Sequence, residues 1–331
     1  ITFFMSALLD NMTTTIIMVM LLRKLVANYK ERWVFASLII IAANSGGAWS
    51  PIGDVTTIML WVKGTVTSFP LIRALIIPCI VSVVIPTLLA SRILKGILHA
   101  PDYVDMDGNR PEYISRGESL RILIVGVGLL VMVPVFKSVT GLPPYMGVMT
   151  ALGILWIYTE ILYDRKRDIE ESVKNRVTKV IKHIDMPTIL FFLGILMSVA
   201  ALQSAGILGQ FSTFLDDKVH NIYAINTMIG LLSSVVDNVP LVAGATGMYP
   251  IMEPSMVAAS ADPAYMSAFV QDGQFWHLLA YCAGVGGSIL IIGSAAGVVA
   301  MGLEKINFMW YLRNISLMAL TGYLAGIGIY M

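Results

Sequence analysis

The pattern of apolar positions divides the chain into stretches long enough to cross a lipid bilayer. One crossing by a helix needs about 20 apolar residues. Uninterrupted apolar stretches occupy residues 70–90, 120–136, 142–163, 187–208 and 308–331. Because each stretch is close to that length, the pattern predicts an all-α membrane protein with several transmembrane helices.

Other apolar stretches are broken near their middles by polar residues or glycines. Residues 1–22 are broken by Asp10-Asn11, and residues 222–251 are broken by Asp237-Asn238. The remaining breaks lie at residues 44–54 of the stretch 34–62 and at residues 284–297 of the stretch 275–303. Interrupted segments of this kind predict two re-entrant hairpins, 1–22 and 222–251, and two broken transmembrane helices, 34–62 and 275–303.

The interrupted stretches occur twice in the same order, which indicates an internal repeat. The hairpin sequences 6–11 and 233–238 align at an offset of 227, and the broken helices align at an offset of 240. We therefore divide the chain into the remainder of a first repeat, residues 1–118, and a second repeat, residues 119–331. If the repeats are equivalent, on the order of a hundred residues with three helices precede Ile1. The chain is thus expected to be an N-terminally truncated fragment.

The distribution of basic residues indicates how the two repeats are oriented. Lys and Arg concentrate on the cytoplasmic side of membrane proteins. Alternating spans place all but four of the 22 basic residues on the side of Arg23, the exceptions being Lys63, Arg73, Lys137 and Lys218. Five crossings then separate the hairpins, so the second hairpin enters from the opposite face. Inverted repeats with interrupted helices are an architecture of secondary transporters.

Composition supports this class and excludes several others. Hydrophobic residues make up 57% of the chain and charged residues 13%, against about 45–50% and about 25% in soluble domains. The 22 basic residues are balanced by 21 acidic ones, so charge provides no argument for a nucleic-acid partner. The two cysteines and four scattered histidines do not form a zinc motif. No cofactor is expected.

Asp10, Asp54 and Asp237 are predicted to lie inside the bilayer. An aspartate there costs about 2.5–3.5 kcal/mol even on a lenient scale, so each is a candidate to bind a cation or a proton. The structural alternative is that these residues cap the helices that follow them. Ser or Thr would cap a helix in a membrane at a lower desolvation cost, which favours the functional interpretation.

Oxygen-rich side chains surround the predicted breaks. Unwound backbone at Gly46-Gly47 and Gly286-Gly287 would expose carbonyl groups that can bind a small cation. Further oxygen ligands are expected from Thr13, Thr14, Asn44, Ser45, Ser50, Ser288 and Ser294. Neither break contains Lys or Arg, whereas an anion site would need them. We therefore expect Na⁺ at Asp10, Asp54 and Asp237, mainly on the first-repeat side, where Asp54 aligns with Ser294 and Asn44 with Gly284.

Three segments resemble the NhaD-type sodium/proton antiporters of the ion transporter superfamily. They are residues 9–15, 42–57 and 236–240. Departures from the family pattern are few, and one is Ser45, where Ala is expected. The resemblance implies exchange of cytoplasmic Na⁺ or Li⁺ for external H⁺, a role in pH and salt homeostasis, a homodimer in the lipid bilayer and an elevator-like moving domain. It also implies these ion-site residues: Asp10, Asn11, Thr14, Asn44, Ser45, Ser50, Asp54, Thr57, Asp237 and Asn238.

Protons and cation would compete for the same carboxylates in such an exchanger. Burial raises and a bound cation lowers the pKa of a carboxyl group in general, so activity should rise with pH. The expected location is a bacterial inner membrane, with a plastid envelope as the alternative. Two other functions stay open: a Na⁺-coupled transporter of dicarboxylates or related anions, and an intramembrane aspartyl protease, whose expected Gly-x-Gly-Asp context is absent around Asp54.

Overall fold

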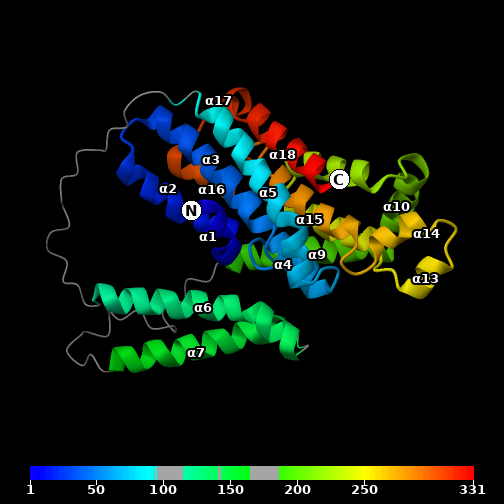
Figure 1. Cartoon of the computed structure of the whole chain (residues 1–331), viewed down its shortest axis with the longest axis horizontal. Helices are drawn as coiled ribbons and strands as arrows, with labels where there is room; N and C mark the ends of the chain where they lie inside the picture. Colours follow the sequence, from blue (N-terminus) through cyan, green and yellow to red (C-terminus); the bar gives the residue numbers. More distant parts are fainter. Residues whose placement is uncertain (93, 95–114, 141, 143, 165–185) are drawn as a thin grey trace. The chain divides into compact units, whose positions relative to one another are not determined.

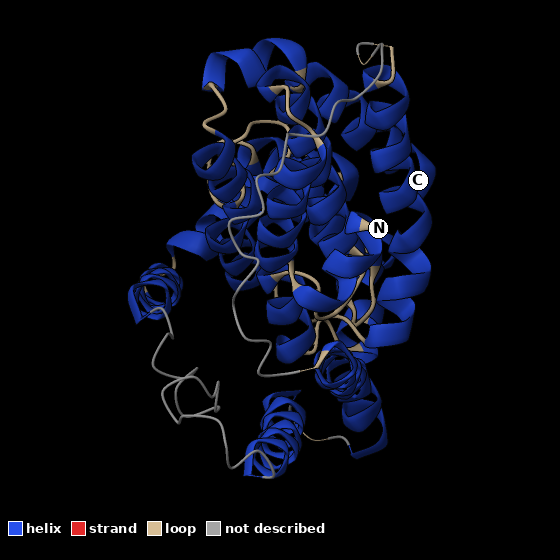
Figure 2. Cartoon of the chain, turned by 90° about the vertical axis from the view of Figure 1, so that its left-hand side faces the viewer, coloured by secondary structure: helices blue, strands red, loops and turns tan. Residues whose placement is uncertain are grey.

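The computed structural model describes residues 1–92, 94, 115–140, 142, 144–164 and 186–331. Regular secondary structure in these ranges is helical throughout, as Figure 2 shows. The chain divides into one unit of Ile1–Pro101 with Gly194–Met331 and a second unit of Asp102–Leu193. The first unit therefore combines residues from both predicted repeats, because the hairpins and broken helices of the two repeats pack together.

The N-terminal part of the first unit follows the predicted order of hairpin, broken helix and span (Figure 1). Its helices are α1 (Thr2–Leu9), α2 (Asn11–Leu25), α3 (Tyr29–Ala48), α4 (Val55–Lys63) and α5 (Ser68–Ala90). Helices α1 and α2 both pack against α3. The hairpin is thus held beside the first half of the broken helix.

The same order recurs toward the C-terminus. After α9 (Met186–Ser204) and α10 (Ile207–Lys218), the hairpin consists of α11 (Ile222–Ser233) and α12 (Asn238–Met248). A loop with the short helices α13 (Pro254–Ala258), α14 (Pro263–Met266) and η2 (Ser267–Phe269) leads to the broken helix, α15 (Gln274–Gly286) and α16 (Ala295–Glu304). The chain ends with α17 (Phe308–Asn314) and α18 (Ser316–Tyr330), which packs along α5 (Figure 1).

In the second unit, helices α6 (Arg116–Thr140) and α7 (Pro144–Asp164) pack against each other. Gly147 of α7 permits the close approach, because a Cβ there would lie 3.0 Å from the ring of Phe136. The charged stretch 165–185 lies outside the described residues.

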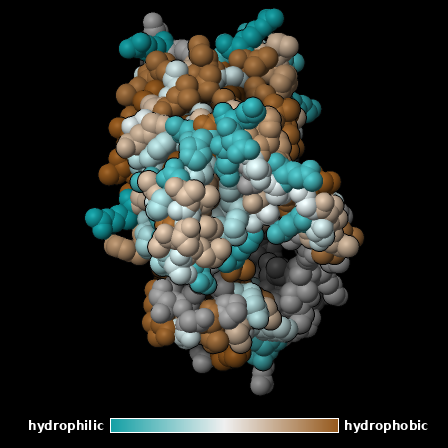
Figure 3. All heavy atoms as spheres, turned by 90° about the vertical axis from the view of Figure 1, so that its right-hand side faces the viewer, coloured by the Kyte–Doolittle hydropathy of each residue, from teal (hydrophilic) through white to brown (hydrophobic). Residues whose placement is uncertain are grey.

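Several surfaces of the described helices are apolar. Ser68–Ala90 and Tyr145–Asp164 are each long and apolar enough to cross a membrane, and the pair α17 and α18, bent by 52°, passes the same test as one span. Many large hydrophobic side chains are exposed, among them Phe69, Leu88 and Leu317, and Figure 3 shows such side chains beside hydrophilic patches. These surfaces suit contact with lipid rather than water.

Two details differ from the predicted boundaries. Helix α3 continues through Gly46 and Gly47 to Ala48, and α15 continues to Gly286, so these three glycines are helical rather than unwound. A Cβ on Gly46 would overlap the Phe3 carbonyl of α1, so Gly46 serves close helix packing. The predicted span 308–331 is not straight, because it bends at Ile315, between α17 and α18.

Candidate ion-binding site

Asp54 lies at the point where the first broken helix resumes as α4, and only 2% of its surface is exposed. Its carboxylate Oδ2 accepts a hydrogen bond from Asn238 Nδ2 at 2.9 Å and another from the Thr56 hydroxyl at 2.7 Å. The backbone N–H of Asp54 donates to the Thr57 hydroxyl at 3.2 Å. Within the described residues no Lys, Arg or His forms a salt bridge with Asp54. Its carboxylate is therefore buried without a cationic partner among the described residues.

The break before Asp54 is a tight loop tied to the first hairpin. A Cβ on Gly53 would come within 2.8 Å of the Gly47 backbone, so only glycine fits there. The Ser50 hydroxyl donates to the Ala7 carbonyl of α1 at 2.7 Å. The hairpin thereby fixes the loop that positions Asp54.

A second group of polar side chains surrounds Asn44, which is fully buried in α3. Asn44 Nδ2 donates to the hydroxyls of Ser288 at 2.9 Å and Ser294 at 2.8 Å, and Asn44 Oδ1 accepts from Asn11 Nδ2 at 3.1 Å. One amide therefore joins the first hairpin to both ends of the break in the second broken helix.

The other two predicted aspartates lie at the turns of the hairpins. Asp10 adopts a left-handed conformation, φ 68°, and caps α2 by accepting from the N–H of Thr13 at 2.9 Å and from its hydroxyl at 2.8 Å. Asp237 precedes α12 without a side-chain capping bond. Both carboxylates lie close enough to interact electrostatically with Asp54. Across the described ranges, no three His, Cys, Asp or Glu side chains form a group that could hold a metal ion.

The remaining predicted residues have separate surroundings. The Ser45 hydroxyl accepts from Ser82 of α5 at 2.9 Å. Thr14 is fully buried, and its hydroxyl has no hydrogen-bond partner among the described residues. Thr56, whose hydroxyl bonds to Asp54, was not among the predicted site residues, although it stands two residues after an intramembrane aspartate.

The two hairpins contact their broken helices through matching atoms. Ser6 Oγ donates to the Ala43 carbonyl at 2.6 Å, and Ser233 Oγ donates to the Ala283 carbonyl at 2.8 Å. These pairs are related by the offsets of 227 and 240 that align the sequences. A Cβ on Gly286 would overlap the Gly230 carbonyl, and a Cβ on Gly46 would overlap the Phe3 carbonyl. The same two offsets relate these residues.

Comparison with known proteins identifies the family. A family model with the description "Citrate transporter" matches residues 1–270. The chain belongs to this family. The family is one of membrane transporters rather than of enzymes.

Several curated relatives of this chain carry names of cation exchangers. "Sodium/proton antiporter 1" and "Sodium/proton antiporter 2" of Arabidopsis thaliana are 44% and 43% identical to it over the whole chain, which covers 54% and 74% of their respective lengths. "Na(+)/H(+) antiporter NhaD" of Vibrio cholerae serotype O1 is 32% identical over 99% of the chain and 68% of the relative. The chain spans about half the length of the first of these relatives. The resemblance to NhaD-type antiporters is confirmed.

Away from Asp54, a cluster of charges around a buried carboxylate links the two broken helices. Glu304, at the end of α16, has a side chain that is 1% exposed. Its carboxylate pairs with Arg23 of α2 at 2.6 Å and with Arg32 of α3 at 2.9 Å. The indole of Trp33 donates to the Glu304 carbonyl at 3.0 Å. One carboxylate thus holds the first hairpin and both broken helices together at this end of the unit.

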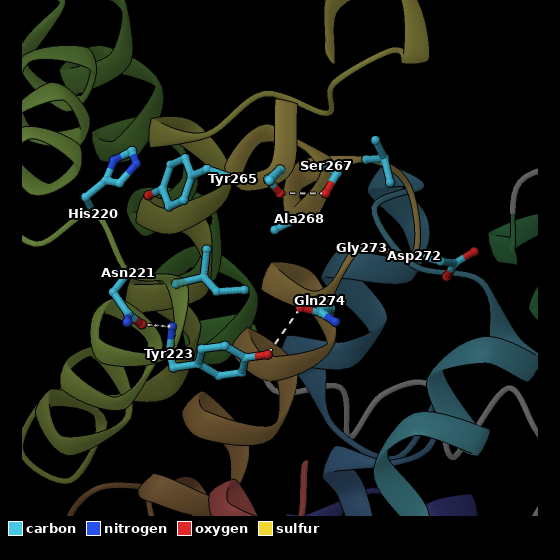
Figure 4. A pocket seen from close by; sticks show the side chains of 12 residues that line it. His220, Asn221, Tyr223, Tyr265, Ser267, Ala268, Asp272, Gly273 and Gln274 are labelled. Carbon is cyan, nitrogen blue, oxygen red and sulfur yellow. Dashed lines mark hydrogen bonds between the residues drawn. The ribbon is translucent and has the colours of Figure 1, made fainter. Parts of the chain in front are cut away.

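A cavity of about 540 Å³ in the transporter lies apart from the predicted aspartates and is shown in Figure 4. It is lined by residues 220–223 and by residues of the loop 264–274. At its edge the His220 ring stacks on Tyr265 with centroids 4.2 Å apart, and His220 Nε2 lies 3.2 Å from Asp262 Oδ2. None of the predicted ion-site residues lines this cavity.

Proposed function

We propose that this protein exchanges Na⁺ or Li⁺ for H⁺ by alternating access, with Asp54 as the carboxylate that carries the cation or the proton. The observation that carries the proposal is the burial of Asp54 without a cationic partner among the described residues. A carboxylate in such a place is stable when it is protonated or when it binds a cation. These two states are those that an exchanger alternates between.

Neighbouring groups suit Na⁺ as the cation. Hard cations prefer oxygen ligands, and the Thr56 hydroxyl lies 2.7 Å from Asp54 Oδ2. The nearby charges of Asp10 and Asp237 favour positive over negative cargo. The names of the relatives, which refer to sodium/proton antiport, support the same proposal.

The test uses everted membrane vesicles that contain the full-length protein. Addition of Na⁺ or Li⁺ should release protons from acid-loaded vesicles, more strongly as pH rises, because protons compete with the cation. Asp54→Asn should abolish this exchange, whereas Asp272→Asn, in the loop before α15, should retain it as the matched control. Unchanged exchange in Asp54→Asn would show the proposal to be wrong.

A second candidate is Na⁺-coupled transport of citrate or a dicarboxylate. The description of the family model favours it. The sequences of both hairpin turns and both breaks, however, contain no Lys or Arg to bind a carboxylate substrate. Na⁺-driven uptake of labelled citrate or succinate into right-side-out vesicles distinguishes the two candidates.

We further propose that the chain forms inverted repeats and works as a homodimer in its membrane. The matching contacts of Ser6 and Ser233 support the repeat. The pairing of Glu304 with Arg23 and Arg32 agrees with the predicted cytoplasmic side, to which both arginines were assigned. Cross-linking of single-cysteine variants tests the dimer. The bacterial inner membrane stays a prediction, since relatives at 43% and 44% identity come from a plant.

A further inference from the structure

The positions that flank the two helix breaks correspond in backbone but differ in side chain. Asp54 precedes α4 at φ −149° and ψ 151°, and Ser294 precedes α16 at φ −149° and ψ 154°. The offset of 240 relates these residues. The repeat therefore builds the same backbone twice and places a carboxylate at only one of the two sites.

A second difference lies opposite each of these residues. A Cβ on Gly284 of α15 would lie 3.8 Å from Asp54 Oδ2 and 3.0 Å from the Cβ of Ala48. The residue related to Gly284 by the offset is Asn44, and the residue related to Ala48 is Ser288. Asn44 indeed contacts both Ser294 and Ser288, at 2.8 Å and 2.9 Å. Beside Asp54, the repeat-related position is Gly284 and has no side chain. Beside Ser294, the equivalent position is Asn44, whose amide fills the space.

The hydrogen bonds of Asn44 satisfy the polar side chains around Ser294 without a cation. Its NH₂ group presents two hydrogens to the oxygens of Ser288 and Ser294, which would otherwise be free to coordinate an ion. Its Oδ1 is satisfied by Asn11. All four side chains are buried and neutral, so nothing there demands a positive charge.

We propose that the Asn44 amide occupies the counterpart of the Asp54 site, so that each protomer has one cation site instead of a symmetric pair. This inference rests on the proposed function, and it gives Asn44 the role of an occupant rather than the ligand that the sequence predicts. Coupling then requires protons and a single cation to compete at Asp54.

Counting bound ions tests the inference. Equilibrium binding of radioactive Na⁺ to the purified full-length protein at alkaline pH should saturate at one ion per protomer. Saturation at two ions would overturn the inference and leave the proposed exchange standing. Absence of Na⁺ binding would overturn both.

Substitutions can transfer the side chains of one repeat to the equivalent positions of the other repeat. Gly284→Asn should fill the place beside Asp54 and lower Na⁺ affinity at least tenfold, whereas Gly302→Asn, at an exposed position of α16 with open space around it, should leave affinity unchanged. Asn44→Gly combined with Ser294→Asp should raise the saturation from one ion to two. Undiminished Na⁺ affinity in folded Gly284→Asn protein would contradict the inference. If the variants fail to fold, the number of Na⁺ ions bound per protomer of the unmodified protein decides the question.

Discussion

Asn238 of the second hairpin donates its side-chain hydrogen bond to Asp54 of the first broken helix, over 2.9 Å and across 184 residues of sequence. The bond connects the two predicted repeats at Asp54, the carboxylate that we propose to bind the transported cation or proton. A hairpin movement that breaks this contact would change the surroundings of Asp54 directly. The pair is therefore a point at which conformation and ion binding are coupled.

Asn238→Ala is expected to weaken Na⁺ binding roughly tenfold or more. A hydrogen bond to a charged group contributes about 1.5–3 kcal/mol, and about 1.4 kcal/mol is a tenfold change in affinity. Apparent Na⁺ affinity in everted vesicles measures the effect. Asn226→Ala is the matched control, because Asn226 is also buried but donates to the Ile222 carbonyl within α11. Equal affinity in both variants would argue against the role of Asn238.

Glu304→Gln is expected to lower the stability of the protein by about 2 kcal/mol. Removing one partner of a fully buried ion pair costs about 3–5 kcal/mol, and the loss is smaller here because Arg23 is 43% exposed. Unfolding of the purified protein in detergent measures the change. Glu253→Gln, at an exposed position, should leave the stability unchanged. Equal stability of the two variants would contradict the prediction.

Ser6→Ala and Ser233→Ala are expected to destabilise the protein by similar amounts, about 1 kcal/mol each. Each substitution removes one buried hydrogen bond from a hairpin to a broken helix. Ser198→Ala removes an exposed bond within α9 and should have a smaller effect. Strongly unequal losses for Ser6 and Ser233 would weaken the case for a structural repeat.

The loop before α15 is expected to loosen in acid. The backbone N–H of Tyr265 and the side chain of His220 lower the pKa of Asp262 below its ordinary value. A lowered pKa means that the capping contact is complete above the ordinary value of about 3.9 and is lost as pH falls through the lowered pKa. The protection of the Tyr265 amide from hydrogen exchange, taken relative to the intrinsic exchange rate at each pH, should fall between about pH 5 and below about pH 3. Asp262→Asn should show no such pH dependence over this range.

Much of the fold could be predicted from the sequence because apolar length and polar breaks depend on the membrane rather than on detailed packing. The breaks at Asp10, Asp54 and Asp237 each separate two helices as expected. The exact break in the first broken helix was misplaced, because a glycine in an apolar stretch serves equally to unwind a helix or to let another backbone approach. Gly46 does the second, against Phe3.

The pairing within the candidate site could not be read from sequence. Asn238 and Asp54 are each conspicuous, but no periodicity relates residues 184 positions apart. Asp10 caps α2, which is the structural alternative to ion binding that the sequence allows. One carboxylate can cap the start of a helix and keep lone pairs for other partners, so capping and ion binding are compatible. The part of Asp10 in ion binding stays a prediction.

The charge cluster of Glu304 also has a consequence for biosynthesis. Arg23 is synthesised 281 residues before its partner carboxylate. At about 5–20 residues per second, the ribosome needs roughly a quarter of a minute to a minute to supply that partner. The charge cluster can therefore form only after translation of α16 is complete.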